Sequence, residues 1–112
     1  MQSVNDLLAT ALIVFGVDDH ATVDDIMNIK THKSQLYALG PVYGFMYHGK
    51  RYYLIDDYSL DNNPTYVRNI VEEINHLAEG GPLARPSAAN EDELYATSIN
   101  NTEYYLWEGS IS

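Results

Sequence analysis

The chain has 112 residues and carries 16 Asp and Glu against 6 Lys and Arg, which gives a formal charge of −10 at pH 7. This length predicts a single domain over residues 1–112, and the absence of cysteine excludes disulfides, thiol nucleophiles and cysteine-based zinc sites. The excess of negative charge disfavours nucleic-acid binding overall and favours a cationic partner.

The N-terminal residues show no targeting segment. Residues 1–6 carry no positive charge, and the apolar run over 11–17 is far shorter than the ~20 residues of a membrane span. We therefore expect a soluble, cytoplasmic protein that does not bind membranes.

Two capping boxes predict helices in the first third of the chain. Ser3 with Asp6 precedes a helix from about residue 4 to 15, and Gly16 is suited to end it in a left-handed conformation. Thr22 with Asp25 opens a second helix.

The helical pattern continues as a further piece over 34–39 that ends at Gly40-Pro41. The sequence leaves open whether the second helix and this piece are one helix or two, broken near Thr31.

The pattern then changes to strands. Residues 42–47 and 51–55 are rich in Tyr and in large apolar residues, and they flank a short connection that contains Gly49, which predicts a hairpin. Residues 56–64 read as a polar loop. A helix then begins near Pro64, with apolar residues at intervals of three and four up to Leu77.

The last third predicts a second hairpin. Residues 79–90 contain Gly, Pro and Ala and indicate an irregular connection within the domain. Residues 94–99 and 102–107 flank Asn100-Asn101, a pair that tolerates positive φ. The order α-α-β-β-α-β-β predicts an α+β fold, in which a small antiparallel sheet of two hairpins is packed by three helices on one face.

Acidic residues occur in clusters near helix starts and loops. An Asp at a helix start commonly has a structural use, because it binds free backbone amides. Interleaved with ten Tyr, however, the clusters also favour docking onto a basic protein surface. The predicted partner-binding acids are Asp18, Asp19, Asp24, Asp25, Asp56, Asp57, Glu72, Glu73, Glu91, Asp92 and Glu93.

Two tyrosine doublets lie on predicted strands, at 52–53 and at 104–105. Because successive side chains of a strand point to opposite faces, one ring of each doublet is expected on the outer face of the sheet. We take Tyr53 and Tyr105 as the aromatic contacts of the predicted partner-binding surface.

A basic window at residues 30–51 supports a different reading. It has a charge of +4, against −14 for the rest of the chain, and its cations are Lys30, Lys33, Lys50 and Arg51. With the helical pieces before it, this window resembles an excisionase-type winged helix, which implies a DNA-recognition helix over 34–39 and a wing at the first hairpin. The piece over 34–39 departs from that pattern because it lacks an arginine.

Enzyme motifs are absent from the sequence: there is no G-x-S-x-G, no glycine-rich phosphate loop and no H-E-x-x-H. We expect no catalytic activity, no cofactor and no metal. The size and composition resemble those of small phage-encoded inhibitors of host defence and of acidic immunity proteins. The sequence therefore predicts an inhibitor that occupies the basic nucleic-acid-binding surface of an enzyme or defence complex. A winged-helix DNA-binding regulator is the alternative.

Overall fold

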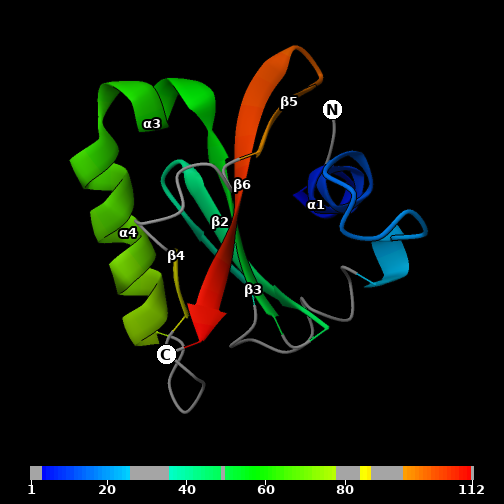
Figure 1. Ribbon diagram of the computed structural model, residues 1–112, viewed down its shortest axis with the longest axis horizontal. Coiled ribbons are helices and arrows are strands. Elements are labelled where there is room, and N and C mark those ends of the chain that lie inside the picture. Colours follow the sequence, from blue (N-terminus) through cyan, green and yellow to red (C-terminus); the bar gives the residue numbers. More distant parts are fainter. Residues whose placement is uncertain (1–3, 26–35, 49, 78–83, 87–94, 112) are drawn as a thin grey trace.

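An antiparallel sheet of six strands separates helices on its two sides in the computed structural model, which describes residues 4–25, 36–48, 50–77, 84–86 and 95–111 (Figure 1). The α+β class predicted from the sequence is confirmed. In chain order the elements are α1 (Val4–Val14), β1 (Leu36–Leu39), β2 (Val42–Tyr47), β3 (Lys50–Asp56), α3 (Asp57–Asn62), α4 (Pro64–Leu77), β4 (Ala84–Pro86), β5 (Tyr95–Ile99) and β6 (Thr102–Ile111).

Strands β3 and β6 form the centre of the sheet. The order is β1-β2-β3-β6, and two strands share the far edge of β6: β5 pairs with residues 102–106 and β4 with residues 109–111. Both predicted hairpins, β2–β3 and β5–β6, are present. Asn100 and Asn101 have φ values of 52° and 67°, so the second turn adopts the positive φ that the sequence predicts.

The sheet buries apolar residues on both faces, not on one face as predicted. Tyr52 and Leu54 of β3 point into the layer beneath α1, whereas Tyr53 and Ile55 point into the layer beneath α3 and α4. The centre of this strand, residues 52–55, has no polar face, because its alternate positions are apolar on both sides. A strand of that kind needs cover on both faces, and the helices supply it.

Residues 36–39 form a strand, so the predicted helical piece over 34–39 is wrong for these four residues. Leu36 pairs with Phe45 and Leu39 pairs with Val42, which leaves Gly40-Pro41 as a two-residue turn. Gly40 has a φ of 53°, a conformation that favours glycine. Ladder hydrogen bonds to β2 outweigh the weak local helical preference of this short segment.

The predicted polar loop over 56–64 contains a helix. Asp56 caps α3: its Oδ1 accepts from the Ser59 backbone N–H at 2.7 Å, and its Oδ2 accepts from the Ser59 hydroxyl at 3.0 Å. Leu60 is buried on the sheet side of this short helix. The predicted irregular connection over 79–90 is likewise wrong for residues 84–86, which form β4.

The helix starts agree with the sequence where the structure describes them. Helix α1 ends at Val14, and Gly16 follows with a φ of 75°. In the second capping box, the Asp25 N–H donates to Thr22 Oγ1 at 3.3 Å and the Thr22 N–H donates to Asp25 Oδ2 at 2.9 Å. Residues 23–25 are helical, while Ser3 and most of that second helix lie outside the described residues.

Candidate protein-binding surface

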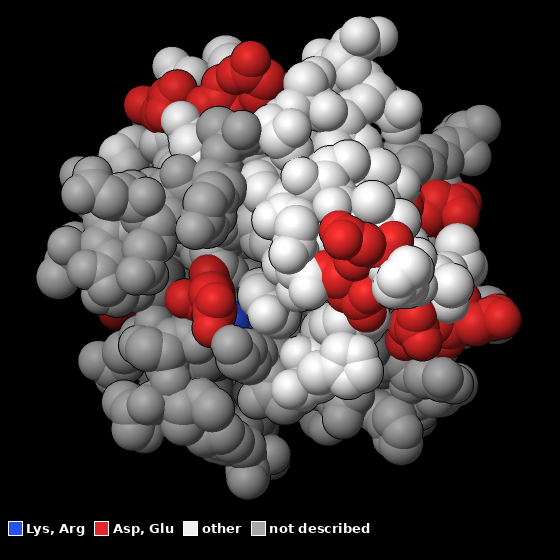
Figure 2. All heavy atoms as spheres, turned by 45° about the vertical axis from the view of Figure 1, so that its right-hand side comes forward, with Lys and Arg blue, Asp and Glu red and all other residues white. Residues whose placement is uncertain are grey.

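The predicted acidic clusters do not form one surface. Asp18, Asp19, Asp24 and Asp25 follow α1, whereas the cluster at 56–57 and Glu72-Glu73 belong to the other side of the sheet, with α3 and α4 (Figure 1). Figure 2 shows the described acids as separate groups divided by other residues. A flat partner can therefore contact only some of them. Glu91, Asp92 and Glu93 lie outside the described residues.

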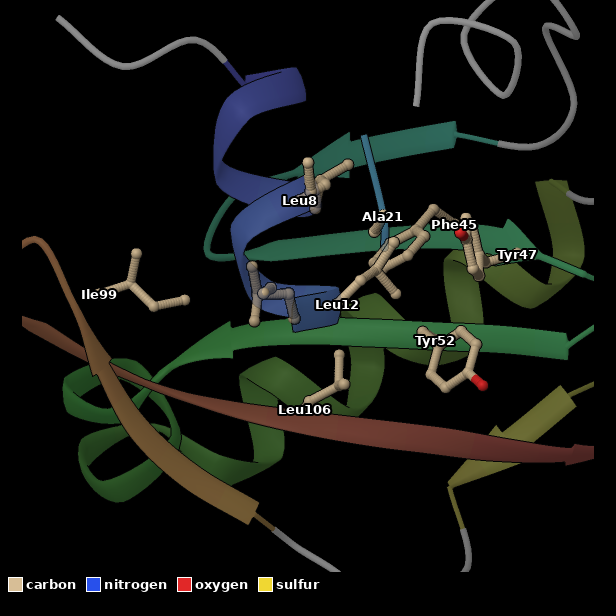
Figure 3. Close-up of a cluster of buried hydrophobic side chains, with 11 residues drawn as sticks. Leu8, Leu12, Ala21, Phe45, Tyr47, Tyr52, Ile99 and Leu106 are labelled. Carbon is tan, nitrogen blue, oxygen red and sulfur yellow. The ribbon is translucent and has the colours of Figure 1, made fainter. Parts of the chain in front are cut away.

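Three of the predicted contact acids have structural roles. Asp18 accepts from the Tyr47 hydroxyl at 2.6 Å and from the His20 N–H at 2.9 Å. Figure 3 shows Tyr47 in the layer of buried side chains beneath α1. The bond from Tyr47 lowers the pKa of Asp18, and burial followed by this same bond raises the pKa of Tyr47. Asp25 belongs to a capping box and Asp56 is the N-cap of α3.

Tyr53 is not available to a partner, so its prediction as an aromatic contact is wrong. Its side chain is 0% exposed beneath α4, where its hydroxyl donates to Asn75 Oδ1. The error follows from the assumption of an open sheet face, because α4 covers the face to which Tyr53 points.

The acids of α3 lie next to Tyr105 at one corner of the molecule, and Tyr58 belongs to the same short helix. We name the group of Asp57, Tyr58, Asp61, Glu103 and Tyr105 the acidic corner. The Tyr105 hydroxyl and the carboxyl group of Asp61 both hydrogen-bond to Asp57, and the charge of Glu103 also acts on Tyr105. Tyr58 is 76% exposed and Glu103 is exposed. The corner thus combines three carboxylates with an accessible aromatic ring.

Electrostatics make the acidic corner suited to a cation. The hydrogen bond with Asp57 raises the pKa of Asp61, and burial followed by the charges of Asp57 and Asp61 raises the pKa of Tyr105. A raised carboxyl pKa means that two neighbouring negative charges disfavour each other. An ammonium or guanidinium group bound between them is attracted by both charges, and a tyrosine face can stack on it.

Sequence reasoning missed Tyr58, Asp61 and Glu103 as members of this surface. Asp57 and Asp61 are four residues apart, which places them on one face only if the segment is helical. The segment reads as a polar loop because it is six residues long and lacks apolar periodicity. The N-cap pattern formed by Asp56 and Ser59 is the signal that could have revealed α3.

Of the four cations of the basic window, the structure describes the side chain of Arg51. Arg51 is 4% exposed, which contradicts its assignment as a DNA contact. The predicted recognition helix is the strand β1 over 36–39. Lys30, Lys33 and the side chain of Lys50 lie outside what the structure describes.

The described residues contain neither a metal-binding cluster nor a membrane-spanning helix. In the described ranges, no group of three or more His, Asp and Glu side chains is placed to hold a metal ion, and no helix is long and apolar enough to cross a membrane. Comparison of the chain with protein-family models, with curated proteins and with solved structures gives no match.

Proposed function

We propose that this protein inhibits a partner by occupying a basic, nucleic-acid-binding surface, and that the acidic corner makes the central contact. The observation that carries the proposal is the grouping of three carboxylates around Tyr105, with the exposed ring of Tyr58 on the same short helix as two of them. Such a group offers charge in place of nucleic-acid phosphates and aromatic area in place of bases.

The charge of the whole chain supports the same reading. The side chains that the structure describes include twelve Asp and Glu but only two Arg, and one of these, Arg51, is buried. A strongly negative surface steers a positive groove toward it, and association then slows as salt screens the attraction.

The class of partner follows from this chemistry. We propose a basic protein, either a nucleic-acid-processing enzyme or a defence complex, as in the phage-encoded inhibitors and immunity proteins that this chain resembles in composition. We place the encounter in the cytoplasm, because a chain without cysteine gains no stabilisation from an oxidising compartment.

The test begins with the immobilised wild-type protein, which captures its partner from a host lysate for identification by mass spectrometry. The purified partner is then bound to a fluorescent duplex or single strand, and the protein is titrated in. We expect the protein to displace the nucleic acid. The double variant Asp57→Asn/Asp61→Asn should bind the partner about 10- to 100-fold more weakly, since it removes two contact charges.

The matched control is Asp19→Asn/Asp24→Asn, which changes the net charge equally on the other side of the sheet. It should slow association at low salt but leave the dissociation rate unchanged. Simultaneous binding of protein and nucleic acid to the partner would refute the inhibition mechanism. Equal effects of both double variants on dissociation would remove the acidic corner from the contact.

A further inference from the structure

The layer between α4 and the sheet contains buried polar groups that need an acceptor. Arg51, Asn75 and Trp107 are 4%, 6% and 3% exposed. Within the described part of the chain, Nε and Nη1 of Arg51, Nδ2 of Asn75 and Nε1 of Trp107 have no hydrogen-bond partner. All four atoms are N–H donors, so the layer is rich in donors and short of acceptors.

Tyr53 connects these donors. Its hydroxyl donates to Asn75 Oδ1 on α4, and its backbone pairs with Trp107 on β6. Arg51 lies two residues before Tyr53 on β3 and so points to the same face of the sheet. The Arg51 guanidinium lies 5.8 Å from the centroid of the Tyr37 ring, whose hydroxyl donates to the Leu77 carbonyl at the end of α4.

The guanidinium charge distinguishes this site from an ordinary buried amide. A water molecule can accept a hydrogen bond from the Asn75 amide or the Trp107 indole, but it carries no negative charge to neutralise a buried guanidinium. Burial lowers the pKa of Arg51, and the groups that oppose this effect are Tyr53 and Tyr37, with no carboxylate of the described residues among them. The charge therefore calls for an anionic acceptor.

We propose that Arg51 and Asn75 form a binding site for a free oxyanion of the phosphate or carboxylate type. Two oxygens of such an anion match Nε and Nη1 of the guanidinium fork, and another oxygen can accept from Asn75 Nδ2. The site lies beneath α4 and is separate from the acidic corner, so it adds a ligand to the proposed function and does not depend on it.

Trp107 provides the reporter, because it is the single tryptophan of the chain and its indole N–H lies in the same layer. The wild-type protein is titrated with inorganic phosphate and, separately, with acetate, against sodium chloride of equal ionic strength. We expect a saturable shift of the Trp107 indole resonance with at least one oxyanion and none with chloride.

Two arginine variants make the test specific. Arg51→Met should abolish the shift, while Arg68→Met should retain it, since Arg68 is exposed on α4 with its guanidinium 5.8 Å from the Trp107 ring centroid. If Arg51→Met does not fold, Arg51→Lys keeps the charge but loses the fork. That variant should bind about tenfold more weakly or worse.

Three results would overturn the proposal. One is the absence of a saturable response in the wild type, and another is a response that Arg51→Lys leaves unchanged. The third is a thermodynamic coupling, in a protein that does not bind phosphate, between Arg51 and an acid outside the described residues. The acids to test are Glu79, Glu91, Asp92 and Glu93. The acceptor of the Arg51 hydrogen bonds would then be a side chain of the protein itself. Each of these results leaves the variants of the acidic corner as an independent test of the proposed function.

Discussion

At the scale of single residues, Gly44 sets how closely α4 packs on the sheet. A Cβ atom at this position would lie 2.9 Å from Ile74 Cγ2 and 3.1 Å from Ile74 Cδ1, and Ile74 is fully buried. Gly44→Ala must therefore displace α4 or force a new rotamer on Ile74. We expect a loss of about 1–3 kcal/mol in the free energy of unfolding, measured by urea denaturation.

A double variant tests that reason for the loss. Ile74→Ala by itself should cost about 2–5 kcal/mol because it leaves a cavity. In Gly44→Ala/Ile74→Ala the new methyl group occupies part of that cavity, so the combined loss should be smaller than the sum of the two single losses. Additive losses would show that Gly44 is needed for some reason other than its contact with Ile74.

The hydrogen bond between Tyr47 and Asp18 makes stability depend on pH. The bond lowers the pKa of Asp18 in the folded protein, so its contribution is complete above the ordinary Asp pKa and is lost as the pH falls through the lowered value. Asp18→Asn should thus destabilise the protein at pH 7 and have less effect in acid, as measured by denaturation at both pH values. Asp19→Asn, at the exposed neighbouring carboxylate, is the control and should show a smaller change at pH 7.

At the scale of elements, α3 depends on its cap because a helix of six residues has little stability of its own. Asp56→Ala removes the acceptor of the Ser59 N–H and hydroxyl, and we expect a loss of about 1 kcal/mol in the free energy of unfolding. The Ser59 amide should also exchange its hydrogen faster. Asp56→Asn keeps a cap acceptor and should retain most of the stability; an equal loss in both variants would contradict the capping role.

The elements that could be predicted from the sequence are those with their own local signal. Two asparagines mark the β5–β6 turn, and α4 shows apolar residues at intervals of three and four over fourteen residues. Strand β1 has four residues and α3 has six, so each is too short for a repeated apolar pattern to identify it. Both are specified by contacts with distant residues, the ladder with β2 and the burial of Leu60, which a local pattern does not contain.

The candidate site follows the same division. The excess of acid and its position near residues 56–57 could be read from the sequence. The sequence also offered Tyr105 as an aromatic contact, but its position beside Asp57 depends on the packing of α3 against β6. The burial of Tyr53 and Arg51 could not be read from the sequence. Tyr53 is buried by residues of α4, and Arg51 lies against Tyr37 of β1, so both depend on segments remote in the chain. The alternation of side chains along β3 indicated that successive residues point to opposite faces of the sheet. It did not indicate that helices cover both of these faces.

At the scale of the whole molecule, the two buried layers share the same central strands. Leu8 and Leu12 of α1 pack with Leu54 and Leu106 on one face, as Figure 3 shows for the labelled residues, while Trp107 packs beneath α4 on the other. Because β3 and β6 contribute to both layers, loss of one layer should unfold the other, giving a single cooperative transition.

Leu12→Ala tests this coupling, since the change lies on the α1 face and the fluorescence of Trp107 reports the α4 face. We expect a loss of about 2–5 kcal/mol, with the urea midpoints from Trp107 fluorescence and from far-UV circular dichroism shifting together. Ile74→Ala, in the α4 layer, should likewise give coincident transitions. If Leu12→Ala shifts the midpoint of the dichroism transition but leaves the midpoint of the Trp107 transition in place, the coupling is refuted. In that case α1 unfolds as a separate unit, and the sheet stays folded with α4 alone. Such an outcome is incompatible with central strands that need both layers.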